Sequence, residues 1–428
     1  MSQDIISRNI HKKSTLNVVG LLISGSALAQ ILQLLSQSFL ARLYDVSQFG
    51  ILAQVSSAGS IIAVAGTLQM HQAMVLPRSE EESCDLFATG FFASTLIAVI
   101  FFFAFSYWKV DLFGDTLSNL LPLLCSVFAL GLCYGYLLRG WQTARGNFKV
   151  LSIFTVIHAI CIILFQIGMG FLEVDKGLIY GVLIGEFVTS LFFIIFRYAP
   201  RISSVSASLI QPRKIFNYIK SYYQFSFIGT IQELVSLSVL MFPLFMFSMM
   251  YGTEIGGQYA MAHRFAWAPV LLVGNAFTQI SFYTFSGLSI KELKVFPTLK
   301  FGKRTFAILC VGGAGALIFP IILPLILGKK WLLAGELGGW VSIWAVFFFL
   351  SIPYRVCYRV LQWQFAQLIV DGIILLCQFI LFHNLSKISP VVMMCCLAIV
   401  GIFQNIIMII VMRFLLSIHV RKSLTFTV

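Results

Sequence analysis

The sequence predicts an all-α polytopic membrane protein with about twelve transmembrane helices, in two pseudo-symmetric six-helix lobes around a central cavity. Composition is the first reason: hydrophobic residues make up 59% of the 428 positions, charged residues make up 11%, and the mean hydropathy is +0.94. A soluble domain carries more charge than this. Length is the second reason, because twelve spans of about 20 residues use about 240 residues and leave short loops.

The apolar segments fall into two sets of six, in chain order. The spans are expected at about 16–40, 46–70, 86–107, 118–138, 150–172 and 178–198, and then at 222–248, 256–285, 305–327, 336–354, 366–384 and 390–412. Residues 1–15 form the N-terminus, 16–198 and 222–412 the two lobes, 199–221 the linker between them and 413–428 the tail. An even number of spans puts both ends of this chain on one side.

An internal repeat is the third reason. At a constant offset of 207 residues, identical residues recur around the first turn between helices of each set: Tyr44, Gly50, Ala53 and Gln72 match Tyr251, Gly257, Ala260 and Gln279. Two sets of six spans in the same orientation form a parallel repeat, related by an axis along the membrane normal.

The basic residues indicate the topology. Twenty-two of the 29 lysines and arginines lie in the N-terminus, in the even-numbered loops between spans, and in the C-terminal tail. By the positive-inside rule these parts, including both termini, are expected to be cytoplasmic. The net charge of +13 therefore reflects topology and calls for no nucleic-acid partner.

The first span carries a polar face. Gln30, Gln33 and Gln37 follow Ser26 at spacings of 4, 3 and 4 residues, so all four lie on one side of a helix. Such side chains either hold helices together by hydrogen bonds or line a hydrophilic cavity that binds sugar hydroxyls. Both interpretations stay open at this stage.

The segment 256–279 contains an arginine in an otherwise apolar helix. Arg264 and Asn275 fall on one face. A guanidinium in hydrocarbon costs several kcal/mol, so Arg264 is not expected to face lipid. It either reaches an interface or an acidic partner, or lines a hydrated cavity that holds an anionic substrate.

Three acids lie well inside spans: Glu186, Glu233 and Asp371. Each is either part of a structural ion pair, with Arg264 or a nearby basic loop residue, or a carboxyl that exchanges an ion or proton. Asp371 shares a helical face with Gln364, Gln367 and Gln378. Glu233 is the first choice for ion coupling because it corresponds, 207 residues later, to the polar face of the first span.

Arg355 and Arg359 lie one helical turn apart at a cytoplasmic end. Together they can grip a phosphate, or they simply obey the positive-inside rule. Catalysis has little support, because the sequence shows no nucleotide-binding loop, catalytic triad or metal-ligand spacing, and its nine cysteines read as small packing residues. We expect no enzyme activity, cofactor or metal site.

Several stretches resemble the bacterial polysaccharide-biosynthesis flippases, a family within the multidrug/oligosaccharidyl-lipid/polysaccharide exporter superfamily. They are FLARLYDVSQFGILAQVSS at 39–57, AMVLPRSEEES at 73–83, RGWQTARGNFKVLSIFTV at 139–156, QIGMGFLEVDKGLIYGVLIG at 166–185 and GGQYAMAHRFAWAPVLLVGNAFTQISF at 256–282. Beyond 285 the match is mainly in hydropathy, which leaves Arg355, Arg359 and Asp371 without family support.

The resemblance implies a flippase for undecaprenyl-diphosphate-linked oligosaccharide, an O-antigen (lipopolysaccharide) or capsule repeat unit, working by alternating access with H+ or Na+ as coupling ion. Membrane lipids and other polysaccharide-assembly proteins are the expected partners. Two alternatives remain. A cation-coupled drug exporter of the same superfamily is expected to use an acid in an early span, and the first five predicted spans have none. A membrane O-antigen polymerase or glycosyltransferase needs a sizeable periplasmic loop or an acidic metal motif, and neither is present.

Overall fold

A computed structural model describes residues 2–77, 79–107, 120–201, 205, 209, 211–286, 288, 290–295, 299, 303–385 and 387–425. This part of the chain is almost entirely helical and contains no β-strand. It forms two compact units, Met1–Leu234 and Val235–Val428, which are described separately below.

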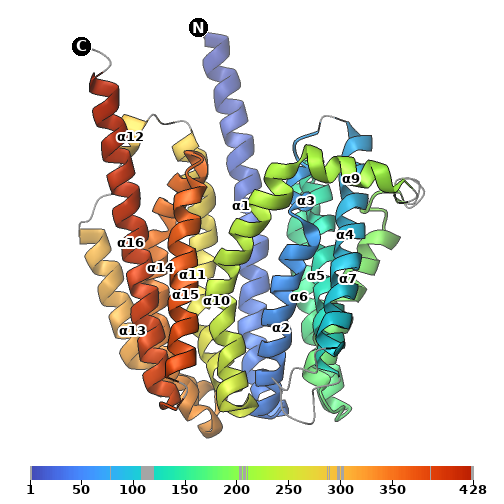
Figure 1. The fold of residues 1–428 in the computed structure, drawn as a ribbon, viewed down its shortest axis with the longest axis vertical. Coiled ribbons are helices and arrows are strands. Elements are labelled where there is room, and N and C mark those ends of the chain that lie inside the picture. Colours follow the sequence, from blue (N-terminus) through green and yellow to red (C-terminus); the bar gives the residue numbers. More distant parts are fainter. Residues whose placement is uncertain are drawn as a thin grey trace. The chain divides into compact units, whose positions relative to one another are not determined.

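The first unit is a bundle of long helices with three short elements (Figure 1). The long helices are α1 (Ser2–Leu43), α2 (Val46–Thr67), α4 (Glu80–Tyr107), α5 (Leu121–Ala144), α6 (Phe148–Phe171) and α7 (Gly177–Ile195). The short elements are α3 (Met70–Ala73), α9 (Pro212–Ser221) and a π-helical turn, η1 (Gln224–Gly229). α10 (Thr230–Tyr251) starts in this unit and continues into the second.

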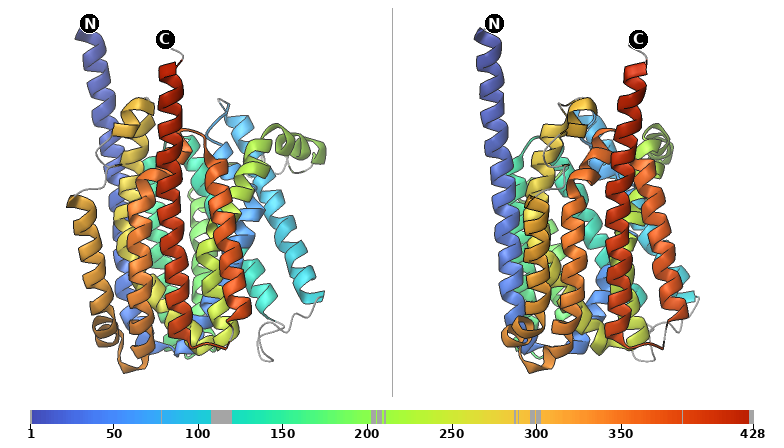
Figure 2. Two further views of the ribbon diagram at one scale, coloured as in Figure 1. Left: turned by 60° about the vertical axis from the view of Figure 1, so that its left-hand side comes forward. Right: turned by 90° about the vertical axis from the view of Figure 1, so that its left-hand side faces the viewer.

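The second unit also consists of long helices. These are α11 (Thr253–Ser286), α13 (Lys303–Leu327), α14 (Leu332–Val360), α15 (Gln364–Asn384) and α16 (Pro390–Thr425), with the short α12 (Ile290–Val295) and a 3-10 turn, η3 (Lys329–Trp331). α14 is central, since it packs against α11, α13 and α16. Figure 2 shows α16, in red, extending past the ends of its neighbours in this unit.

These helices confirm the predicted all-helical membrane fold. Within the described residues each predicted span has a long helix, and ten helices are long and apolar enough to cross a membrane. The repeat is visible in the helix boundaries, because α2 begins at Val46 and α11 begins at Thr253, 207 residues later.

Several helices extend beyond the spans predicted from hydropathy. α1 and α16 continue through much of the predicted N-terminus and tail, α4 begins at Glu80 rather than 86, and α14 runs to Val360 rather than 354. Hydropathy marks where the side chains become polar, whereas backbone hydrogen bonds can continue past that point. The predicted linker 199–221 likewise contains a helix, α9.

Glycines bring α6 and α7 close together. Gly177, Gly181 and Gly185 repeat every four residues on α7 and so lie on one face. A Cβ atom on Gly181 would lie 2.6 Å from Cα of Gln166, and one on Gly185 would lie 2.7 Å from Cα of Ile162. Small residues at this spacing let membrane helices pack backbone to backbone. Such close packing drives helix association in a membrane, because lipid gives no hydrophobic driving force for it.

α9 is held across one end of the first unit, against α4 (Figure 1). Lys214 Nζ lies 2.8 Å from Asp85 Oδ2, and the Tyr218 hydroxyl donates to the same oxygen at 3.0 Å. The Tyr222 hydroxyl donates to Glu82 Oε1 at 2.9 Å. Burial, with this bond and the Glu82 charge, raises the pKa of Tyr222 to about 12, so its phenol remains a donor at neutral pH.

We expect Asp85→Asn to loosen α9. Asp85 is buried, and replacing its charge leaves the Lys214 ammonium without its partner, at a cost of about 1–3 kcal/mol. Every trypsin site in α9 is kept, so faster tryptic cleavage at Arg213 and Lys220 measures the release. Glu81→Gln, an exposed carboxyl four residues earlier, is the matched control. Equal cleavage of all three proteins would show that α9 is held by other contacts.

The predicted topology can be checked at two exposed positions in the first unit. Asn217 lies on α9, and Asp175 lies in the loop between α6 and α7. With the native cysteines replaced, a membrane-impermeant maleimide added to intact cells should label Asp175→Cys and leave Asn217→Cys unlabelled until the cells are opened. The reverse pattern would invert the topology.

Candidate functional site: buried polar groups in the two units

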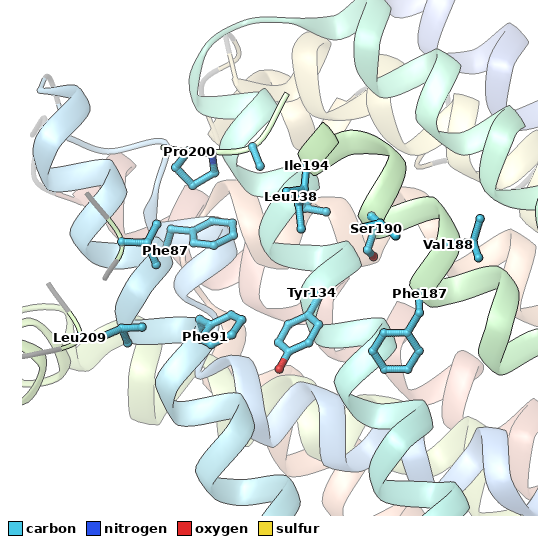
Figure 3. A pocket seen from close by; sticks show the side chains of 13 residues that line it. Phe87, Phe91, Tyr134, Leu138, Phe187, Val188, Ser190, Ile194, Pro200 and Leu209 are labelled. Atoms are coloured by element: carbon cyan, nitrogen blue, oxygen red, sulfur yellow. The ribbon is translucent and has the colours of Figure 1, made fainter. Parts of the chain in front are cut away.

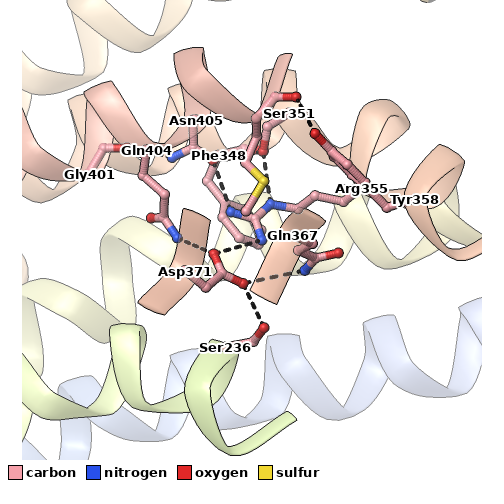
Figure 4. Close-up of polar contacts among 11 residues, drawn as sticks. Ser236, Phe348, Ser351, Arg355, Tyr358, Gln367, Asp371, Gly401, Gln404 and Asn405 are labelled. Carbon is pink, nitrogen blue, oxygen red and sulfur yellow. Dashed lines mark hydrogen bonds and ion pairs between the residues drawn. The ribbon is translucent and has the colours of Figure 1, made fainter. Parts of the chain in front are cut away.

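A polar network centred on Asp371 lies inside the second unit, and Figure 4 shows it. The Asp371 side chain is completely buried. Its Oδ2 accepts from the Ser236 hydroxyl of α10 at 2.6 Å, and its Oδ1 accepts from Gln404 Nε2 of α16 at 2.7 Å. Gln367 Nε2, one turn earlier on α15, lies 3.5 Å from Oδ2. Three helices therefore meet at one carboxylate.

Arg355 of α14 completes this network. Its Nη1 lies 3.9 Å from Asp371 Oδ1, its Nε donates to the Ser351 hydroxyl at 3.1 Å, and its Nη2 donates to Asn405 Oδ1 at 3.3 Å. Its guanidinium carbon lies 4.9 Å from the centre of the Phe348 ring. A buried charge is tolerated when it is paired and its hydrogen bonds are satisfied, and this network provides both.

This arrangement changes the interpretation of two predicted residues. Arg355 was expected just outside a span, but α14 continues to Val360 and places Ser351 and Arg355 on the face that meets α15 and α16. It is a partly buried member of the network, whereas Arg359, one turn later, is exposed. The two arginines therefore have different environments. Asp371 pairs with Arg355, which was expected at the loop end of its span, and not with Arg264.

The glutamine face of α15 points into the second unit. Gln367, Asp371 and Gln378 are buried, and Gln378 Nε2 donates to the Val239 carbonyl of α10 at 3.1 Å. These contacts hold α15 against α10 and α16, as expected for polar residues that join membrane helices.

Glu186 is paired inside the first unit. Its Oε2 lies 2.9 Å from His158 Nε2 of α6, and both side chains are largely buried. His158 also stacks on Phe154 with ring centres 6.1 Å apart. The sequence offered only Arg264 or a basic loop residue as a partner for Glu186, so His158 was missed. No local sequence pattern predicts this pair, because His158 and Glu186 lie on different helices and are 28 residues apart in the chain.

Glu233 lies in the first turn of α10, directly after the π-helical turn η1. Its side chain is partly buried. π-helical turns within helices frequently occur at functional sites. Glu233 therefore combines a partly buried carboxyl with an irregular backbone directly before it.

The polar face of α1 has no uniform environment. Gln37 is buried and donates from Nε2 to the Gln33 carbonyl at 3.2 Å, Gln30 is partly buried, and Gln33 is exposed. α1 packs mainly against α6. The face is therefore partly packed inside the first unit and partly open.

Arg264 is partly buried on α11 and has interaction partners within the protein. One turn further, Trp267 is buried against Trp344 and Phe348 of α14, with ring centres 5.7 and 4.8 Å apart. Asn275 also lies on α11, but its side chain is outside the described part of the structure.

Asp85 is the acid whose burial was not predicted from the sequence. It was expected just before a span, yet it is buried in α4 and paired with Lys214. Ser236, Ser351, Gln404 and Asn405 were also missed as members of a buried network. The adjacent amides at 404 and 405, in an otherwise apolar segment, are the signal that could have found the last two.

In the described residues no group of histidine, cysteine, aspartate or glutamate side chains could hold a metal ion. What the fold and these buried groups define is a polytopic helical membrane protein with charged networks inside its units. A family model described as polysaccharide biosynthesis protein matches residues 39–335. The chain belongs to this family. A search of curated proteins found no match.

Solved structures share the fold at low sequence identity. The lipid II flippase MurJ, in an inward closed conformation, matches with a TM-score of 0.69 and 14% identity, over 93% of this chain and 90% of that one. An inward-facing multidrug resistance MATE family transporter of the MOP superfamily matches with a TM-score of 0.61 and 14% identity, over 94% and 96%. The eukaryotic MATE transporter AtDTX14 matches with a TM-score of 0.61 and 12% identity, over 97% and 98%. The fold is therefore shared with these transporters.

Proposed function

We propose that this protein is a flippase that translocates an undecaprenyl-diphosphate-linked oligosaccharide, an O-antigen or capsule repeat unit, across the bacterial inner membrane. The observation that carries the proposal is membership of the polysaccharide biosynthesis family over residues 39–335. The fold shared with a lipid II flippase agrees with it. The two units would act as N- and C-terminal lobes in alternating access, with both termini in the cytoplasm.

Substrate binding is assigned to polar residues that the sequence singled out. Arg264, with Arg355 and Arg359, would attract the diphosphate, because a guanidinium can donate two parallel hydrogen bonds to phosphate oxygens. Gln30, Gln33, Gln37 and Asn275 would bind sugar hydroxyls. The exposed Arg359 and Gln33 are accessible in this structure, whereas Arg355 and Gln37 would have to leave their present contacts.

Energy would come from an ion gradient, since the sequence has no nucleotide-binding motif. One charge that crosses 100 mV supplies about 2.3 kcal/mol. We assign the coupling first to Glu233, then to Asp371 and Glu186. Glu233 lies beside η1, whereas Asp371 and Glu186 are already held by Arg355 and His158.

The test is flipping of a lipid-linked oligosaccharide in proteoliposomes with and without a pH or Na+ gradient. Glu233→Gln keeps the size and hydrogen-bonding capacity but removes the titration, so flipping should continue without responding to the gradient. Glu254→Gln changes an exposed acid and is the control. Wild-type coupling in Glu233→Gln, Asp371→Asn and Glu186→Gln would show that the carboxyls are structural.

A cation-coupled drug exporter is the second candidate, favoured by the shared fold with MATE transporters. The same proteoliposomes decide between the two. Gradient-driven accumulation of cationic drugs with no flipping of the lipid-linked oligosaccharide would establish the exporter. Genes for glycosyltransferases and a polymerase beside this one would support the flippase.

A further inference from the structure

An apolar crevice of about 550 Å³ lies in the first unit between α4, α5 and α7. Figure 3 shows its lining, in which Phe87 and Phe91 come from α4, Tyr134 and Leu138 from α5, and Phe187 from α7. Ile194, at the end of α7, is 41% exposed and lies where the crevice opens to the outside of the unit. The wall of the crevice is therefore apolar, and the crevice is open to the surroundings of the bundle.

A second, cationic pocket adjoins this crevice. It is lined by Arg145, Arg197 and Arg201, and it shares Ile194, Ala199 and Pro200 with the apolar crevice. Glu80 also lines it, but this carboxylate is ion-paired with Arg145, whose guanidinium stacks 4.2 Å from the Trp141 ring centre. In the part of the chain that the structure describes, Arg197 and Arg201 have no acidic partner. Two positive charges are therefore left at the mouth of an apolar crevice.

The backbone holds Arg197 in an unusual conformation. It follows Phe196, the residue that caps the end of α7, and has φ of +60°, where glycine is usual. Arg197 N donates to the Ile194 carbonyl at 3.1 Å, and Tyr198 N donates to the Phe193 carbonyl at 2.9 Å. Gln142 Nε2 on α5 also donates to the Tyr198 carbonyl. Arg197 therefore occupies a backbone conformation that glycine adopts with less strain.

We propose that this composite site binds one anionic phospholipid, with an acyl chain in the crevice and its phosphate between Arg197 and Arg201. Arginine is suited to phosphate because its planar fork donates two hydrogen bonds. The volume of the crevice indicates the length of the acyl chain. A methylene group is about the size of a water molecule, which occupies about 30 Å³ in the liquid, so about eighteen carbons fill the crevice. A long polyprenyl chain is several times larger than this volume, so most of it would lie outside the crevice.

The position of the charges agrees with a lipid of the cytoplasmic leaflet. Residues 197–201 belong to the end of the unit that carries the predicted cytoplasmic loops, and anionic lipids of that leaflet attract basic residues beside spans. The site is built entirely from the first unit. It does not depend on the proposed function, because a bound lipid of this kind is compatible with either transport substrate.

The test uses purified full-length protein in nanodiscs with phosphatidylglycerol that carries a diazirine midway along one acyl chain. After irradiation, mass spectrometry should locate the crosslink in α4, α5 and α7 around the crevice. Native mass spectrometry measures how much phosphatidylglycerol is retained. Arg197→Gly combined with Arg201→Gln removes both charges while Gly suits the positive φ, so it should fold and retain at least 10-fold less lipid. Arg213→Gln, an exposed arginine on α9, is the matched control.

Ile194→Trp tests the apolar part separately, because the larger side chain fills the mouth of the crevice. It should lower crosslinking inside the crevice with Arg197 and Arg201 unchanged. Equal labelling of wild type and both variants would overturn the proposal. So would displacement of the lipid by inorganic phosphate at equal concentration, which would mark a site for a free anion, or preferential binding of a polyprenyl phosphate over phosphatidylglycerol.

Discussion

Arg355→Ala is expected to destabilise the protein by about 3–5 kcal/mol, the usual result of removing one partner from a buried ion pair. The mutation leaves Asp371 completely buried, with hydrogen bonds from Ser236 and Gln404 but no positive charge. Asp371→Asn should have a similar effect, because it leaves the guanidinium unpaired. The measurement is the decrease in the thermal unfolding midpoint in detergent. Transport in proteoliposomes is measured alongside it.

The double variant Arg355→Met with Asp371→Leu separates stability from transport. Replacing both members of a buried pair with apolar residues is often neutral or stabilising by about 1–4 kcal/mol. If the double variant recovers stability but not transport, the pair has a functional role as well as a structural one. If it recovers both, the network only holds α14, α15 and α16 together. Arg359→Ala, which changes an exposed arginine on the same helix, should leave the midpoint unchanged.

Arg264→Ala is expected to abolish transport while the protein still inserts into the membrane. A charge-assisted hydrogen bond contributes about 1.5–3 kcal/mol, so losing a bidentate grip on phosphate lowers substrate affinity about 10- to 100-fold. Arg264→Lys should keep part of the activity, since the charge remains but the planar fork is lost. Flipping rates and substrate binding in proteoliposomes check both variants.

Two outcomes would reject this role for Arg264. If neither variant accumulates in the membrane, Arg264 stabilises α11 through its contacts inside the protein. If Arg264→Ala transports at the wild-type rate, the residue neither binds substrate nor supports the fold. His263→Gln, at the neighbouring position on α11, is a useful control because it changes the polarity of the same turn and leaves the arginine in place.

Much of the architecture could be predicted because it depends on local properties. A helix that crosses a bilayer needs a continuous apolar segment of a certain length, and both are visible in sequence. The shared face of Gln367, Asp371 and Gln378 follows from helical periodicity, and the structure places all three in the interior. The 207-residue repeat also recurs in the starts of α2 at Val46 and α11 at Thr253, although hydropathy had placed the second of these starts at 256.

The partners of the buried charges were decided by tertiary structure. Arg355 and Asp371 lie on different helices, as do His158 and Glu186, and the apolar crevice meets Arg197 and Arg201 only when the end of α7 folds beside α4 and α5. Hydropathy and spacing describe one helix at a time. Which faces meet depends on the rotation and close approach of packed helices, here set by features such as Gly181 and Gly185 on α7. In a membrane, side-chain packing and interhelical hydrogen bonds select that arrangement, because lipid is as apolar as the helix surfaces and gives no hydrophobic preference.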